Sequence, residues 1–181
     1  MKIAGIDYSL TSPSLCVHEG KNWSYNNCTF YYLTANKKLE IYNKNIKGEL
    51  HKEYDTPSQR YDNIASWLIK NLNNRDVTNV YLEGYAYAST GLVFQIAENT
   101  GILKDRLWKM KVMTTVVPPT VIKKFSTGKG NANKELIQET FIRETGVDIK
   151  ALTGQTLKQW NPSSDIIDSY YICKYGFQQE N

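Results

Sequence analysis

Short runs of apolar and β-branched residues, separated by turn-forming residues, occupy the first third of the chain. This pattern is typical of strands joined by tight turns. We predict strands over residues 2–8 and 14–18 and a third within residues 22–33, and such short connections favour an antiparallel meander. Residues 35–55 are polar and of mixed charge, which predicts a surface excursion or a mobile loop.

Helical spacing begins after Thr56 and Pro57, which suit the start of a helix. The apolar face of this helix comprises Tyr61, Ile64, Ala65, Leu68, Ile69 and Leu72. Further strands are predicted over residues 77–82 and 112–117, and further helices over residues 91–108, 120–125, 133–144 and 165–175. This order predicts an α/β fold with a mixed sheet covered by helices, and 181 residues favour one domain over residues 1–181.

Basic residues are concentrated in one part of the chain. The formal net charge is only +4, but eight Lys and Arg residues and a single acid, Asp105, lie between Lys104 and Lys134. This segment forms either a solvated lysine face or a surface that follows a phosphate backbone.

The composition narrows the possible classes of protein. Three cysteines, Cys16, Cys28 and Cys173, lack the spacing of a zinc site, so we expect buried reduced thiols. No apolar run approaches the roughly 20 residues that a membrane-spanning helix needs. The first residues suit a strand rather than a signal peptide. We therefore expect a cytoplasmic protein with no membrane partner.

Four acidic residues stand where predicted buried elements end or begin. Asp7 and Glu83 each end an apolar strand, and Asp165 and Asp168 lie three residues apart at the start of the last helix. If these elements pack together, two Mg²⁺ ions about 3.5–4 Å apart would neutralise the carboxylates and clamp the oxygens of a phosphodiester. Singly, each acid has a structural alternative as a turn cap, an exposed strand end or a partner of the helix dipole.

Four segments resemble, in order, the sequence blocks of the RuvC family of Holliday junction resolvases, within the RNase H-like nuclease superfamily. The segments are AGIDYSLTSPSLCV, VYLEGYAYASTGLVFQIAENTGIL, PPTVIKKFSTGKGNANKELIQ and SSDIIDSYYICKYG. The resemblance implies a five-stranded mixed sheet flanked by helices. It also implies a homodimer that binds a four-way DNA junction and nicks two strands symmetrically. The helix over residues 91–108 is a candidate dimer element, because its aromatic and aliphatic residues exceed one clear stripe.

The resemblance also implies roles for particular side chains. It matches the catalytic, metal-binding acids of the family to Asp7, Glu83, Asp165 and Asp168, with Mg²⁺ as the cofactor and Mn²⁺ as a substitute.

The family's basic segment implies roles for four lysines. Lys123 matches a DNA-contacting lysine, and Lys134 matches a catalytic lysine near the scissile phosphate, where a cation stabilises added charge. Lys124 and Lys129 are expected to contact further phosphates. The alternative for Lys123 and Lys134 is an ordinary position on a helix surface.

The sequence departs from the family pattern at three places. Tyr8 and Ser9 replace the frequent Pro-Gly after the first acid, and the distance to the second acid is longer because of residues 35–55. Ala86 stands where an aromatic wedge is expected, so Tyr85 and Tyr87 are the candidates for stacking on an unpaired base, unless they pack at a sheet edge. Virus-encoded members often cut branched DNA more broadly, and we expect the same breadth here, in host cytoplasm if this chain is viral.

Alternative functions remain open at this point. Another RNase H-like nuclease, acting on an RNA–DNA hybrid or on packaging DNA, would use the same acids. A non-catalytic junction-binding protein would retain the fold, although four intact acids argue against it.

Overall fold

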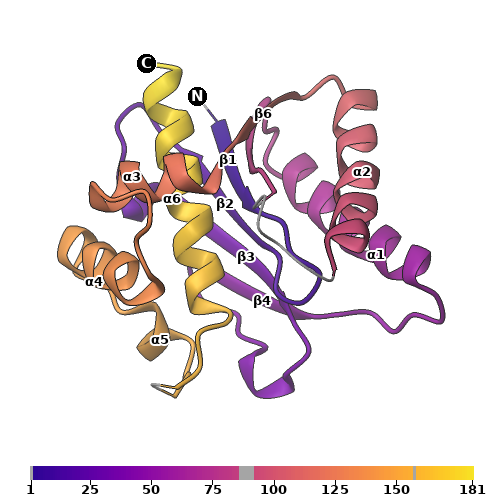
Figure 1. Cartoon of the computed structure of the whole chain (residues 1–181), viewed down its shortest axis with the longest axis horizontal. Coiled ribbons are helices and arrows are strands. Elements are labelled where there is room, and N and C mark those ends of the chain that lie inside the picture. The colour runs from indigo at the N-terminus through magenta and orange to yellow at the C-terminus, as the bar shows by residue number, and fades with distance from the viewer. Residues whose placement is uncertain (1, 86–91, 157) are drawn as a thin grey trace.

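The computed structural model describes residues 2–85, 92–156 and 158–181 (Figure 1). The strands are β1 (Lys2–Asp7), β2 (Ser14–Glu19), β3 (Cys28–Thr34), β4 (Ile46–Leu50), β5 (Asn79–Glu83) and β6 (Met113–Val117). The helices are α1 (Pro57–Asn73), α2 (Val93–Lys109), α3 (Pro119–Thr127), α4 (Lys134–Thr145), α5 (Ile149–Leu152) and α6 (Ser163–Gln179). Short 3₁₀ turns cover Tyr25–Asn27 and Lys37–Leu39.

Within the described residues the strands form one six-stranded mixed sheet of order β4-β3-β2-β1-β5-β6. The first three strands form the predicted antiparallel meander, whereas β5 pairs parallel to β1, and β6 pairs parallel to β5. The predicted α/β class, with a mixed sheet between helices, is confirmed. The sheet has one strand more than the five that the resemblance implies.

The additional strand, β4, lies within residues 35–55, so the prediction of an irregular excursion is wrong there. β4 pairs parallel to β3 at the edge of the sheet and buries Ile46 completely. Its Gly48 lies under the ring of Tyr32, since a Cβ there would be 2.3 Å from Tyr32 Cζ. The strand was missed because one buried apolar residue among polar neighbours produces no clear alternation.

Two hydrophobic cores lie on opposite faces of the sheet. Figure 1 shows α6 across one face with α3, α4 and α5 beside it, and α1 and α2 against the other face. The free thiols of Cys16, Cys28 and Cys173 are all buried, as predicted. In the part of the chain that the structure describes, no helix has the length and apolar character needed to cross a bilayer.

Close packing of α6 on β1 determines where the helix begins relative to the sheet. A Cβ on Gly5 would lie 2.2 Å from the backbone nitrogen of Cys173, so only glycine permits this approach. Where α6 also contacts β2, the hydroxyls of Ser14 and Ser169 meet at 3.2 Å. The helix is buried along most of its length, and its first turns reach the end of β1 that carries Asp7.

Candidate active site

The register of two parallel strands places the first two acids side by side. Ile6 of β1 pairs with Leu82 of β5, and Asp7 and Glu83 follow directly. Both strands run in the same direction, so both carboxylates leave the sheet at the same edge. Asp7 and Glu83 are therefore neighbours at one edge of the sheet and not two separate strand-end acids.

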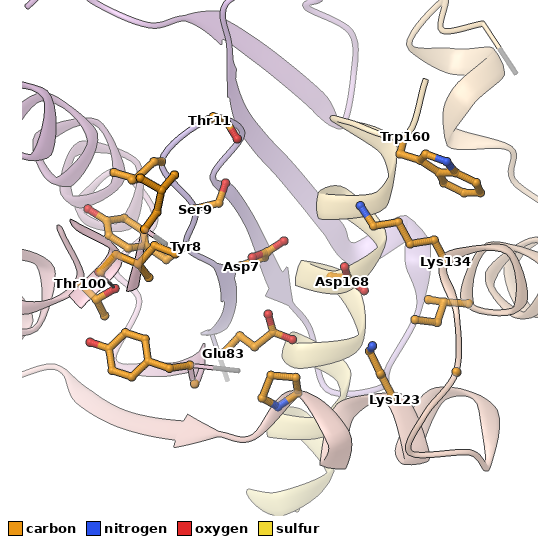
Figure 2. Close-up of a pocket in the computed structure, with 18 of the residues that line it drawn as sticks. Asp7, Tyr8, Ser9, Thr11, Glu83, Thr100, Lys123, Lys134, Trp160 and Asp168 are labelled. Carbon is orange, nitrogen blue, oxygen red and sulfur yellow. Dashed lines mark hydrogen bonds between the residues drawn. The ribbon is translucent and has the colours of Figure 1, made fainter. Parts of the chain in front are cut away.

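The first two turns of α6 bring the other two acids to the same edge. Asp7, Glu83 and Asp168 line one cavity of about 760 Å³, and Figure 2 shows them facing its interior. Asp165 lies one turn before Asp168 and is only 7% exposed. Three elements far apart in sequence therefore contribute four carboxyl groups to one region.

Burial and mutual repulsion raise the pKa of every acid in this group. Burial, and then the negative charges of the other three acids, raise the pKa of Asp7 well above its usual value. Burial raises the pKa of Glu83 to about 7, and burial with the charges of Glu83 and Asp165 raises that of Asp168 to about 8. The pKa of Asp165 rises to about 6, again mainly through burial. Without a cation the group thus retains protons near neutral pH.

Two predicted lysines lie on the opposite side of the cavity. Lys123 comes from α3 and Lys134 from the first position of α4, where the Asn133 side chain caps the helix by accepting from the N–H of Leu136. The charge of Lys134 lowers the pKa of Asp7, and that of Lys123 lowers the pKa of Glu83. Figure 2 shows both side chains directed toward the acids, which is where an anionic substrate would need cations.

Of the other predicted residues, Tyr85, Lys124 and Lys129 lie at or beyond the rim. Tyr85 lines the cavity and is half exposed, with the Lys104 ammonium 5.4 Å from its ring centroid. Tyr87, like Ala86, lies outside the described residues. Lys124 and Lys129 are exposed and do not line the cavity.

The structure adds two residues that sequence reasoning missed. Ser12 is buried in the turn after β1, and its hydroxyl lowers the pKa of Asp165. Trp160 lines the cavity beside Lys134 (Figure 2). Its only sequence signal is an isolated aromatic residue in a polar loop, five residues before Asp165.

The donor chemistry of the site suits a hard divalent cation. Among residues 2–85, 92–156 and 158–181, no three His, Cys, Asp or Glu side chains are grouped so that they could hold a metal ion as placed. The carboxylates are nevertheless the oxygen ligands that Mg²⁺ takes. In addition, Asp165 Oδ2 is buried and has no hydrogen-bond partner among the described atoms. The residue types fit such a cation, and binding requires the carboxylates to turn toward it.

Comparison with known proteins identifies which solved structures share this fold. No protein-family model and no curated protein matches the sequence. Among solved structures, RuvC of Thermus thermophilus covers 99% of this chain and 96% of its own, with a TM-score of 0.62 and 17% sequence identity. The chain has the RuvC fold.

Two further resolvases share the RuvC fold with this chain. The Fowlpox virus resolvase, solved with substrate Holliday junction DNA, matches over 99% of both chains at a TM-score of 0.53 and 15% identity. The yeast mitochondrial Holliday junction resolvase matches over 97% of this chain and 77% of its own, at a TM-score of 0.59 and 12% identity. The resemblance seen in the sequence blocks is therefore confirmed at the level of the fold, in bacterial, viral and yeast proteins.

Proposed function

We propose that this chain is a divalent-metal-dependent endonuclease that resolves four-way junctions and other branched DNA. One observation carries the proposal: Asp7, Glu83 and Asp168 line a single cavity opposite two lysines, with Asp165 adjacent. The RuvC fold supports the choice of branched DNA over other phosphodiesters, because resolvases with this fold have been solved with Holliday junctions.

The four acids would hold the metal and the water. When bound, two Mg²⁺ ions, for which Mn²⁺ would substitute, supply activation of a water and neutralisation of charge on the leaving oxygen. The buried carboxylates must lose their protons for this role, and a cation lowers their pKa by favouring the charged form. Their positions on β1, β5 and α6 would determine where the scissile phosphate lies.

The lysines act on the substrate. Lys134 lies close enough to Asp7 and Asp165 to shift both pKa values, so its ammonium can stabilise charge on the phosphate as water attacks. Lys123 would contact the same strand, and Lys124 and Lys129 would contact neighbouring phosphates. The products would carry 5′-phosphate and 3′-hydroxyl ends.

A homodimer would supply two such sites for symmetric nicks. Helix α2 exposes Phe94 and Trp108 at 77% and 75%, and the neighbouring edge strand β6 exposes Met113. In this proposal the exposed apolar side chains of α2 and β6 would form the surface that binds the second copy of the chain. The free thiols suit the expected cytoplasmic location.

The test compares purified protein on a labelled four-way junction, an RNA–DNA hybrid and a linear duplex, with and without Mg²⁺. We expect paired nicks near the crossover that DNA ligase can reseal, and only with the metal. Equal cleavage of linear duplex would indicate a general nuclease, and cleavage of the hybrid alone would indicate an RNase H.

Asp7→Asn should reduce nicking more than about a hundredfold while junction binding persists. The substitution removes a proposed metal ligand, and this costs more activity than removing a residue that only hydrogen-bonds to a ligand. Asp55→Asn, at an exposed acid outside the cavity, is the matched control. Unchanged nicking by the Asp7 variant would contradict the assigned site.

A further inference from the structure

Among the residues that the structure describes, Trp160 differs in its surroundings from the other partly buried aromatic residues. It is partly buried, yet it belongs to neither of the two hydrophobic cores that the described residues form. Trp23 and Tyr25 are also partly buried, but both pack against the core beneath α6. Packing in either core therefore does not explain a tryptophan there.

The backbone of Trp160 is hydrogen-bonded to the first turn of α6. The carbonyl of Trp160 accepts hydrogen bonds from the Ser163 hydroxyl at 2.7 Å and from the Ser164 N–H at 2.8 Å. These two serines form the first turn of α6, directly before Asp165. These bonds fix the backbone of Trp160, from which the indole extends, relative to the proposed metal-binding acids.

One face of the indole is occupied and the residue still borders the cavity. The Lys150 ammonium lies 3.8 Å from the ring centroid, a cation–π contact that favours this orientation of the ring. Trp160 also lines the main cavity and a small recess shared with Lys134, Ser164 and Asp168. Figure 2 shows the indole next to Lys134 at the rim.

We propose that Trp160 is a substrate-positioning residue on which an unstacked nucleobase next to the scissile phosphate lies. A flat aromatic surface beside a cation matches one nucleotide, since the ring takes the base while Lys134 takes the phosphate. Branched DNA offers such bases because pairing is interrupted at the crossover, whereas a continuous duplex does not. Trp160 would thus favour branched over linear DNA. The sequence indicated Tyr85 and Tyr87, and not Trp160, for stacking on an unpaired base. This inference rests on the proposed function.

The test measures binding of a four-way junction and a linear duplex of equal length in the presence of a chelator, so that no strand is cut. Trp160→Leu keeps apolar volume without an aromatic face, and Trp160→Phe keeps the face. We expect the leucine variant to bind the junction roughly fivefold or more weakly with unchanged duplex affinity, and the phenylalanine variant to remain near the parent protein. Tyr42→Ala, which removes an exposed aromatic that contacts Lys47 away from the cavity, should change neither affinity.

A 2-aminopurine placed next to the mapped nick reports the stacking directly. Its emission in the bound junction should be higher with Trp160→Leu than with the parent protein, because the quenching indole is gone. Equal emission and equal junction affinity for the two proteins would overturn the role of Trp160. An equal loss of junction and duplex affinity, with a lower melting temperature, would also overturn it and indicate a structural residue. If the parent protein neither binds nor cuts junctions, the proposed function itself fails.

Discussion

The two faces of the sheet are both covered by helices, but they are built differently. On one face, α6 approaches β1 so closely that Gly5 has no room for a Cβ, and α6 is buried along most of its length. On the other face, α2 buries Leu103 and Leu107 but leaves Phe94 and Trp108 in solvent. The buried amide of Asn99 on α2 also has no hydrogen-bond partner within the described residues.

This difference separates two tasks. The α6 face carries two of the four acids, and acids that share cations must be held in position to within a fraction of an ångström. Close packing of α6 on β1 fixes the backbone from which these carboxylates extend. The α2 face carries none of those acids, and its exposed apolar side chains remain available to a second copy of the chain. The face that is packed most tightly is the one we propose for chemistry, and the open one is proposed for assembly.

The largest effect should come from filling the space at Gly5. Gly5→Ala places a Cβ against the backbone of Cys173, so we expect a loss of about 1–3 kcal/mol in the free energy of unfolding and a strong loss of nicking as α6 shifts. On the other face, the helical Gly101 has open space around its Cα, and Gly101→Ala should raise stability by about 0.5–1 kcal/mol. Urea denaturation measures both. Equal effects of the two substitutions would contradict the proposed difference between the faces.

The next effect concerns pH and the acids beside α6. Their pKa values are raised in the folded protein, to about 7 for Glu83 and about 8 for Asp168. Between the ordinary carboxyl pKa near 4 and these values, the folded chain binds more protons than the unfolded chain. The free energy of unfolding of metal-free protein should therefore fall as the pH rises through this range.

Denaturation at a series of pH values, with and without Mg²⁺, checks this expectation. Asp168→Asn should show a smaller fall than the parent protein, and Mg²⁺ should reduce the fall in the parent because it binds only the folded chain. An identical pH profile for the variant would show that the pKa of Asp168 is not raised in the folded protein.

A smaller effect on stability, but a clear one on assembly, is expected at the α2 face. Phe94→Glu places a charge on the exposed apolar surface and should weaken dimerisation by roughly tenfold or more, with little change in unfolding. Light scattering measures the mass, and the junction assay should then give single rather than paired nicks. Tyr42→Glu, at an exposed aromatic away from α2, is the control. A dimer that survives the Phe94 change would place the interface elsewhere.

The smallest effect is expected at the outer rim of the α6 side. Lys124 and Lys129 lie outside the cavity, so replacing both with alanine should weaken binding to all DNA structures alike. The slope of log affinity against log salt should decrease by about 0.9 for each lost phosphate contact. A change in the preference for junctions, with no change in slope, would assign these lysines a role in recognition instead.

The sequence predicted most of the fold because most elements have a local pattern. Thr56, Pro57 and an apolar stripe predicted helix α1. In the structure the Thr56 side chain caps this helix by accepting from the N–H of Gln59. The strand β4 had no such pattern, since Ile46 is buried by neighbours that lie far away in the chain. The role of Trp160 was equally hidden, because a lone aromatic in a loop indicates nothing until its surroundings are known.

By itself, the sequence determined that acids end two buried strands and open a helix, and that lysines gather between them. These are local facts, because they depend only on which residue follows which. Only the tertiary structure decided that Asp7 and Glu83 lie side by side and that burial raises their pKa values. It also decided that α6 packs closely on β1 at Gly5. These properties arise from packing between segments up to 170 residues apart, as the Cys173–Ile3 hydrogen bond illustrates, and no local pattern records them.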